Sequence, residues 1–193
     1  MTEDYYELQA NGSAWTHEFN QYKDRVNNAI ITVVERLKLP RGSSVLDVGC
    51  GDGTSLKQWY IEGMVPLGFD ISREKTQYAR DKGLPVINFD IDYENFTVEK
   101  AMDLVFCSHT LEHTRDAIQA SKNLCSLTKD WLVIIVPLEE SFPENNPSHT
   151  QHMNSERIRQ VKETIEKEGF FVILDYQHHL EDEVWFWCQK VNS

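Results

Sequence analysis

The residues best suited to chemistry in this 193-residue chain fall into two groups, a glycine-rich turn and a later set of histidines. The turn is the run Val45–Gly53, in which a strand-like apolar segment containing Asp47 is followed by glycines at alternate positions. The next residues, Ser55–Trp59, are compatible with a helix. Because glycine allows a backbone to approach a ligand closely, this strand–turn–helix pattern predicts a site for a nucleoside cofactor.

The second group begins with His109, Glu112 and His113 and continues with His149 and His152. Residues at i, i+3 and i+4 are neighbours on a helix, so the first three would share a face if their segment is helical. An imidazole with a pKa near ~6.5 can take a proton from a hydroxyl or an amine. We therefore predict that this group orients a substrate or takes a proton from it. His113 is the first choice of base, and His109 and Glu112 are further catalytic candidates.

The same residue types allow two other interpretations. Two imidazoles and a carboxylate with open positions suit a divalent metal, and imidazoles favour Mn, Fe, Co, Ni or Zn over Mg. Alternatively, histidines can cap helices or form hydrogen bonds in the core, which is our expectation for His17, His178 and His179.

The elements that must position these residues alternate between helical and strand periodicity, as in a parallel sheet covered by helices on both faces. A first helix spans about 15–39. Strands are predicted at 44–49, 65–70, 85–89, 103–107 and 130–136, and helices at 54–62, 72–82, 115–127 and 155–168. The last two strands, 170–174 and 184–188, form a hairpin. The expected fold is a three-layer α/β/α, doubly wound, seven-stranded sheet that is mostly parallel with an antiparallel last strand.

A family resemblance rests on the glycine spacing, which is G-x-G-x-G with Asp47 two residues before the first glycine. Dinucleotide-binding dehydrogenases use G-x-G-x-x-G instead, and this segment resembles motif I of class I S-adenosylmethionine (SAM)-dependent methyltransferases. A second strand, Val65–Asp70, ends in an acid at the position where Rossmann-type folds bind ribose hydroxyls, about 20 residues downstream. The resemblance covers about residues 25–191 and implies a methyltransferase with SAM as its cofactor.

The resemblance also implies which residues hold SAM. The segment 88–92 resembles the one whose acid receives the adenine amino group, and 103–109 resembles motif IV, beside the methionine part of SAM. Asp92 or Glu94 could take the place of Asp90. The implied cofactor-binding residues are Asp47, Gly49, Cys50, Gly51, Asp70, Ile71, Asp90, Ile91 and Ser108.

The histidine group is also similar to the metal site of small-RNA 3′-terminal 2′-O-methyltransferases, which combine an E-x-x-E-H segment with a later H-x-x-H-type segment. By that resemblance Glu112, His113 and His152 would bind a divalent metal, with His109 or His149 completing the set. His109 stands where that family has a carboxylate. Small-molecule methyltransferases show a similar L-E-H triplet without a metal.

The composition of the chain excludes some classes of binding partner. The net charge of −12 repels nucleic-acid phosphates, and no basic patch offsets it, so we expect a small-molecule acceptor and no nucleic acid. No apolar run approaches the roughly 18 to 20 residues of a membrane span, and Met1–Asp4 is acidic, so we expect a cytoplasmic protein with no membrane partner. The four cysteines form no C-x-x-C pair, which indicates buried thiols rather than a disulfide framework.

The length fits one domain over 1–193. Two segments are expected to cover the site, an aromatic N-terminal lid at 1–24 and a substrate-side loop at 138–154. The predicted function is transfer of the SAM methyl to an oxygen or nitrogen of a small-molecule or sugar acceptor. One alternative is a metal-dependent 2′-O-type methyltransferase acting on a ribose or diol end. Another, of a different class, is a catalytically idle subunit that binds SAM or metal.

Overall fold

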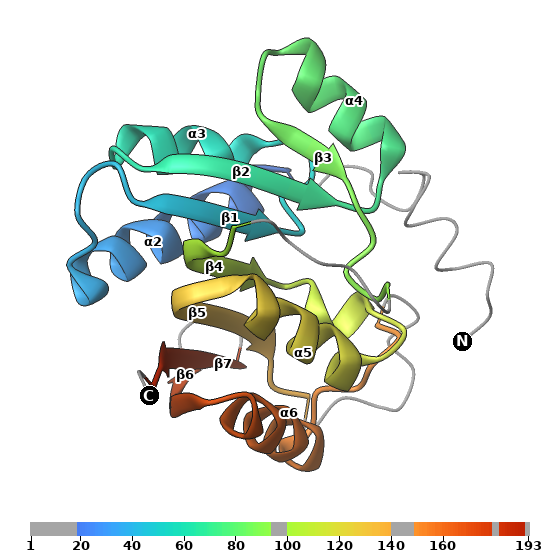
Figure 1. Cartoon of the computed structure of the whole chain (residues 1–193). Helices are drawn as coiled ribbons and strands as arrows, with labels where there is room; N and C mark the ends of the chain where they lie inside the picture. The colour runs from blue at the N-terminus through green and yellow to red at the C-terminus, as the bar shows by residue number, and fades with distance from the viewer. Residues whose placement is uncertain (1–18, 94–99, 140–148, 179–181, 192–193) are drawn as a thin grey trace. The chain divides into compact units, whose positions relative to one another are not determined.

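The computed structural model describes residues 19–93, 100–139, 149–178 and 182–191 (Figure 1). The strands among them form a seven-stranded sheet in the order β3-β2-β1-β4-β5-β7-β6. Strand β7 runs antiparallel to both of its neighbours, whereas β2 is parallel to β1 and β3, and β5 is parallel to β4. The predicted doubly wound α/β sheet with an antiparallel last strand is therefore confirmed. The described residues group into two compact units that divide between Asp90 and Ile91.

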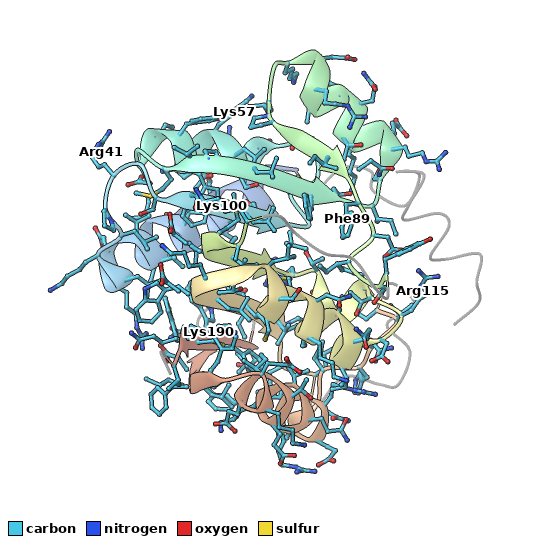
Figure 2. The ribbon with its side chains drawn as sticks, in the orientation of Figure 1. Arg41, Lys57, Phe89, Lys100, Arg115 and Lys190 are labelled. Carbon is cyan, nitrogen blue, oxygen red and sulfur yellow. The ribbon has the colours of Figure 1, made fainter. Side chains whose placement is uncertain are left out.

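The described residues of the first unit form three parallel strands and three helices. Its elements are α2 (Phe19–Leu37), β1 (Ser44–Val48), α3 (Thr54–Ile61), β2 (Val65–Asp70), α4 (Arg73–Asp81) and β3 (Val86–Asn88). Ile30, Leu56 and Trp59 are fully buried, so the apolar faces of α2 and α3 form much of the core. The ring of Phe89, labelled in Figure 2, packs on Phe69 with centroids 4.7 Å apart.

The second unit carries the remaining strands. Its elements are β4 (Met102–Ser108), the 3₁₀ turn η1 (Leu111–His113), α5 (Ala117–Leu127), β5 (Thr128–Pro137), α6 (Ser155–Lys167), β6 (Phe170–His178) and β7 (Asp182–Lys190). Residues 132–136 of β5 are all buried, as expected for a central strand covered on both faces. Helices α5 and α6 lie side by side within this unit (Figure 1).

Several boundaries differ from the sequence predictions. Strands β6 and β7 pair in register from Phe170 with Lys190 to His178 with Asp182, so both are longer than the predicted 170–174 and 184–188. The extra residues are mostly polar, and an antiparallel pair tolerates them because its backbone hydrogen bonds do not depend on apolar side chains. Most of the predicted lid at 1–24, and residues 140–148 of the predicted loop, lie outside the described residues.

The cysteines are free and buried, as expected from their spacing. Within the described ranges, no helix is both long and apolar enough to cross a bilayer.

Asp47 of β1 is a carboxyl group inside the core. It is 3% exposed, and one of its oxygens accepts a hydrogen bond from Nε1 of Trp59 at 3.0 Å. Burial raises its pKa from 3.8 to about 6, although hydrogen bonds to the carboxylate lower it. This contact ties β1 to α3 and makes stability depend on pH.

The raised pKa of Asp47 predicts a stability that falls as pH rises. The folded protein keeps a proton that the unfolded chain loses between about pH 4 and pH 6, so this stabilisation is full below pH 4 and lost above pH 6. Relative to the wild type, Asp47→Asn should therefore gain roughly 2–3 kcal/mol in its free energy of unfolding between pH 4 and pH 7. Urea denaturation across this range measures the difference, and a difference independent of pH would contradict the raised pKa.

Candidate active site

The glycine turn between β1 and α3 adopts a conformation that glycine takes readily. Gly49, Gly51 and Gly53 have φ values of 85°, 56° and 78°. The N–H groups of Gly49 and Cys50 both donate to the carbonyl oxygen of Phe69, at 2.8 and 3.1 Å, which ties the turn to β2. An added Cβ at Gly51 would meet no atom of the described residues within 4 Å. As far as those residues go, the space beside Gly51 is therefore open.

Asp70 ends β2 beside this turn. Its Oδ2 accepts a hydrogen bond from the N–H of Gly51 and its Oδ1 accepts one from the N–H of Ser72, both at 2.8 Å. Burial raises the pKa of Asp70, although these hydrogen bonds lower it. Ile71 follows half-buried, and its carbonyl oxygen accepts from Nδ2 of Asn88 at 2.7 Å. The carboxylate is thus fixed at the end of the second strand, where Rossmann-type sheets bind ribose hydroxyls.

Cys50, also predicted at the cofactor site, has a buried side chain. Burial raises the pKa of its thiol well above the ordinary value, which keeps it protonated and unreactive. A Cβ added at Gly68 would lie only 2.5 Å from its sulfur. Cys50 therefore fills the space that the glycine in β2 leaves, as a small buried side chain.

The remaining predicted cofactor residues follow β3 and β4. Asp90 is half-buried and is the last residue of the first unit. Ile91 is buried in the second unit, and its carbonyl oxygen accepts a hydrogen bond from Nδ2 of Asn123 at 2.7 Å. Ser108 is half-buried at the last position of β4.

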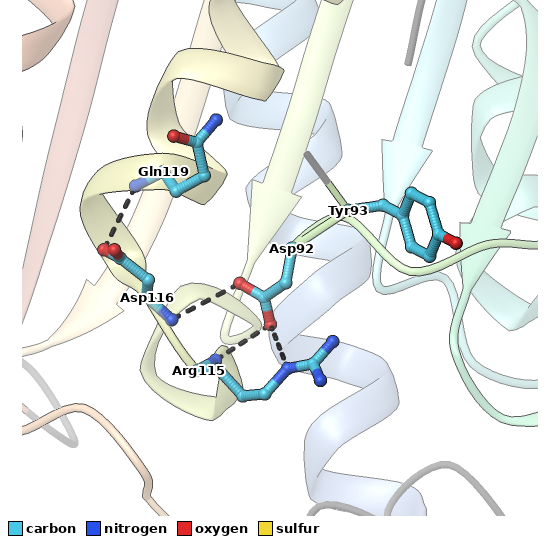
Figure 3. Close-up of a pocket in the computed structure, with 5 residues that line it drawn as sticks. All are labelled: Asp92, Tyr93, Arg115, Asp116 and Gln119. Carbon is cyan, nitrogen blue, oxygen red and sulfur yellow. Dashed lines mark hydrogen bonds and ion pairs between the residues drawn. The ribbon is translucent and has the colours of Figure 1, made fainter. Parts of the chain in front are cut away.

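Asp92, the alternative to Asp90, makes contacts of its own. Its carboxylate accepts hydrogen bonds from the N–H groups of Arg115 and Asp116, at 2.8 and 3.4 Å, and lies 3.8 Å from Nε of Arg115 (Figure 3). Together with Tyr93 and Gln119, these residues line a pocket of about 410 Å³. Asp92 thus holds the chain that enters α5. The other alternative, Glu94, lies outside the described residues.

The first histidine segment begins where β4 ends. His109 has a φ of 48°, in the left-handed region that non-glycine residues rarely adopt, and its N–H donates to the carbonyl oxygen of Ile135 at 2.9 Å. The 3₁₀ turn begins only at Leu111, so the condition for a shared helical face of His109, Glu112 and His113, a helix that includes His109, is not met. The left-handed turn nevertheless brings Nδ1 of His109 to within 3.4 Å of Oε1 of Glu112.

Glu112, His113 and His149 form a cluster. One ligand atom from each lies within 4.8 Å of the others, and the two imidazole rings meet edge to face with centroids 4.9 Å apart. Glu112 is 1% exposed, and its Oε2 is buried with no hydrogen-bond partner among the described residues. His152 is not part of this cluster, and its own Nε2 is likewise buried without a partner in the described part of the chain.

Backbone contacts bring His149 to the cluster. The N–H of Gln151 and Oγ1 of Thr150 both donate to the carbonyl oxygen of Glu112, at 2.9 and 3.2 Å. Nε2 of Gln151 donates to the carbonyl oxygen of Arg115 at 2.7 Å. The segment that carries His149 is therefore docked on the 3₁₀ turn that carries Glu112 and His113.

Two carboxylates that the sequence analysis missed hold the histidines. Oε1 of Glu139 lies 2.6 Å from Nδ1 of His149, and Oε1 of Glu183 lies 2.9 Å from Nε2 of His109. The second oxygen of Glu183 accepts from Nε1 of Trp185 at 3.0 Å. Both glutamates are buried. In sequence they resemble ordinary surface acids, because carboxylates are seldom fully buried unless they are paired.

The electrostatics of the cluster favour an ionised Glu112. Burial raises the pKa of its carboxyl group, but the hydrogen bond and charge of His109 and the charge of His113 outweigh burial, so the pKa lies below its ordinary value. A buried carboxylate among imidazoles can stabilise a protonated histidine or bind a cation.

Comparisons with known proteins agree with this fold. Residues 15–182 match the methyltransferase domain family. Over 148 residues the chain is 28% identical to a ubiquinone biosynthesis O-methyltransferase of Vibrio vulnificus (strain YJ016), which covers 64% of this chain and 63% of that protein. It is 30% identical over 134 residues to a trans-aconitate 2-methyltransferase of Enterobacter sp. (strain 638), which covers 67% and 51%. The chain thus matches less than two-thirds of the length of either relative.

Among solved structures, the magnesium protoporphyrin IX methyltransferase of Synechocystis PCC 6803 with bound SAM superposes with a TM-score of 0.71 over 99% of both chains. At 18% sequence identity this similarity concerns the fold alone. The family match covers most of the chain and the fold agrees with it, so the chain belongs to the methyltransferase domain family and has the fold of class I SAM-dependent methyltransferases.

Proposed function

We propose that this enzyme transfers the SAM methyl group to an oxygen or nitrogen of a small-molecule or sugar acceptor. The observation that carries the proposal is the meeting of one carboxylate and two imidazoles in the Glu112–His113–His149 cluster. The cluster follows the carboxyl end of β4, and ligands of open α/β sheets bind at the carboxyl ends of the strands. The names of both relatives, a ubiquinone biosynthesis O-methyltransferase and a trans-aconitate 2-methyltransferase, support a small-molecule acceptor.

The residues that would hold SAM lie at the ends of the earlier strands. Gly49 and Gly51 would let the cofactor approach the backbone, and the open space at Gly51 supports this role. Asp70 would accept hydrogen bonds from the ribose hydroxyls. Bound SAM supplies a methyl group on a positively charged sulfur. Asp90 and Ile91 would bind the adenine, and Ser108 would lie beside the methionine part.

His113 is the residue best placed to act as the base. It is half-buried beside the buried carboxylate of Glu112, which would stabilise the imidazolium formed when His113 takes the acceptor proton. His109 is less suited to this role, since its two ring nitrogens lie 3.4 and 2.9 Å from the carboxylates of Glu112 and Glu183. In this proposal His109 orients Glu112.

A second candidate function uses a divalent metal at the same cluster. The buried Oε2 of Glu112 has no partner among the described residues, and His113 and His149 offer ligand atoms nearby. A carboxylate and two imidazoles fit Mn, Fe, Co, Ni or Zn, and such an ion would bind the hydroxyls of a diol or ribose end. His149 then takes the place that the sequence prediction gave to His152.

The cofactor assignment predicts that Asp70→Ala lowers the affinity for SAM by roughly tenfold or more, since a charge-assisted hydrogen bond to ribose is lost. Asp70→Asn, which keeps the shape of the side chain, should weaken binding less. Isothermal titration calorimetry measures both variants, and Asp81→Asn, a change in an exposed acid of α4, serves as the matched control. An affinity equal to that of the wild type would remove Asp70 from the site.

The acceptor assignment predicts that His113→Ala binds SAM with the affinity of the wild type but turns over roughly 100-fold more slowly or worse, because the base is lost. Release of S-adenosylhomocysteine measures turnover against a panel of hydroxyl and amine acceptors. Full turnover by the variant would exclude His113 as the base.

The metal candidate predicts that Mn²⁺ or Zn²⁺ raises the unfolding temperature of protein that has first been treated with a chelator, because the ion binds only the folded cluster. His149→Ala and Glu112→Gln should each abolish this rise, whereas His152→Ala should retain it. A response absent from the wild type, or one that survives both substitutions, would exclude a metal at this cluster.

A further inference from the structure

Glu139 is a buried carboxylate for which neither cofactor binding nor base catalysis supplies a role. It is 1% exposed and lies two residues beyond the end of β5. A carboxylate in this position costs free energy unless hydrogen bonds compensate for its lost hydration. Its contacts therefore indicate what it does.

Both oxygens of Glu139 are occupied. Oε1 lies 2.6 Å from Nδ1 of His149, and Oε2 accepts a hydrogen bond from the N–H of Met153 at 2.7 Å. The N–H of Glu139 also donates to the carbonyl oxygen of Met153 at 3.0 Å. Burial raises the pKa of the carboxyl group, but the hydrogen bonds from His149 and Met153 together hold it below the ordinary value. Glu139 therefore accepts through both oxygens and has a fixed orientation.

The contact with His149 has a chemical consequence. A neutral imidazole has one protonated nitrogen and one nitrogen with a lone pair. Because the carboxylate can only accept, it selects the tautomer of His149 in which Nδ1 carries the proton. Nε2 then carries the lone pair, as in histidines whose other ring nitrogen is held by a carboxylate.

We propose that Glu139 is a positioning residue that holds His149, a member of the Glu112–His113–His149 cluster, as its Nδ1–H tautomer, so that Nε2 carries the lone pair of this imidazole. This inference rests on the proposed function for the use of that lone pair, which would accept a proton or bind a metal. The tautomer itself does not depend on the identity of the acceptor.

The other carboxylate–imidazole pair holds a different ring nitrogen. Glu183 lies 2.9 Å from Nε2 of His109, while Glu112 lies 3.4 Å from Nδ1 of the same ring. Carboxylates thus lie beside both nitrogens of His109, and the carboxylate of Glu139 lies beside Nδ1 of His149. In this proposal Glu183 orients the histidine that fixes Glu112, and Glu139 sets the tautomer of His149.

The test is a direct measurement of the tautomer. The full chain is labelled with ¹⁵N-histidine, and long-range ¹H–¹⁵N correlation spectra are recorded at about pH 8.5, above the ordinary histidine pKa. The signals of His149 are identified by their absence in His149→Gln. In the wild type, we expect a protonated Nδ1 and an unprotonated Nε2.

The variant Glu139→Gln tests the cause. Glutamine offers one oxygen and one NH₂ group where glutamate offers two acceptors, so the NH₂ faces Nδ1 of His149 when the oxygen keeps the hydrogen bond from Met153. The preference for the Nδ1–H tautomer should fall roughly tenfold or more. Glu163→Gln, a change in an exposed acid of α6, should leave the spectrum of His149 unchanged.

A wild-type His149 with its proton on Nε2 would overturn the proposal, and so would an unchanged tautomer in a folded Glu139→Gln protein. If that variant does not fold, the wild-type tautomer and Glu139→Asp, whose shorter side chain cannot maintain both contacts, still decide the question. SAM titration of the same samples separates the two claims. If the wild type does not bind SAM, the proposed function is contradicted, but the measured tautomer of His149 still tests the role of Glu139.

Discussion

The buried carboxylate of Glu112 is the group on which the arrangement of the histidines depends. A carboxylate that is 1% exposed needs polar partners to replace its lost hydration, and the imidazoles of His109 and His113 lie beside it. The carbonyl oxygen of the same residue accepts two hydrogen bonds from the segment that carries His149. One residue thus fixes the cluster through both its side chain and its backbone, and two further carboxylates, Glu139 and Glu183, orient the imidazoles around it.

Asp70 has a comparable part in the first unit. Its two oxygens hold the glycine turn on one side and the start of α4 on the other. Cys50 fits against Gly68 because β2 has no side chain there, so the turn lies close to the strand that ends in Asp70. In each unit an acid at or just beyond the carboxyl end of a parallel strand organises a polar site, which is where ligands of open α/β sheets bind. This rule supports our proposal that the cofactor binds at the glycine turn and the acceptor binds at the histidines.

The features that could be predicted from sequence are those that depend on local spacing. The glycine turn, the acid that ends β2 and the alternation of strands and helices each depend on residues close together in the sequence. The fold and its family could therefore be predicted from these segments. The positive φ of His109 could not be predicted from the sequence, because residue types other than glycine do not indicate a left-handed backbone conformation. The choice of His149 over His152 depends on how residues 149–153 dock on the 3₁₀ turn, which is a contact between distant segments. Glu139 and Glu183 were missed for the same reason, since their partners lie 10 and 74 residues away in sequence.

The most direct test of the central claim, that the Glu112–His113–His149 cluster serves the acceptor of a SAM-dependent reaction, is a crystal structure with S-adenosylhomocysteine bound. We expect the ribose hydroxyls to contact Asp70 and the sulfur, from which the methyl has left, to be directed toward the cluster. A sulfur directed away from Glu112, His113 and His149, toward a surface that contains none of them, would contradict it.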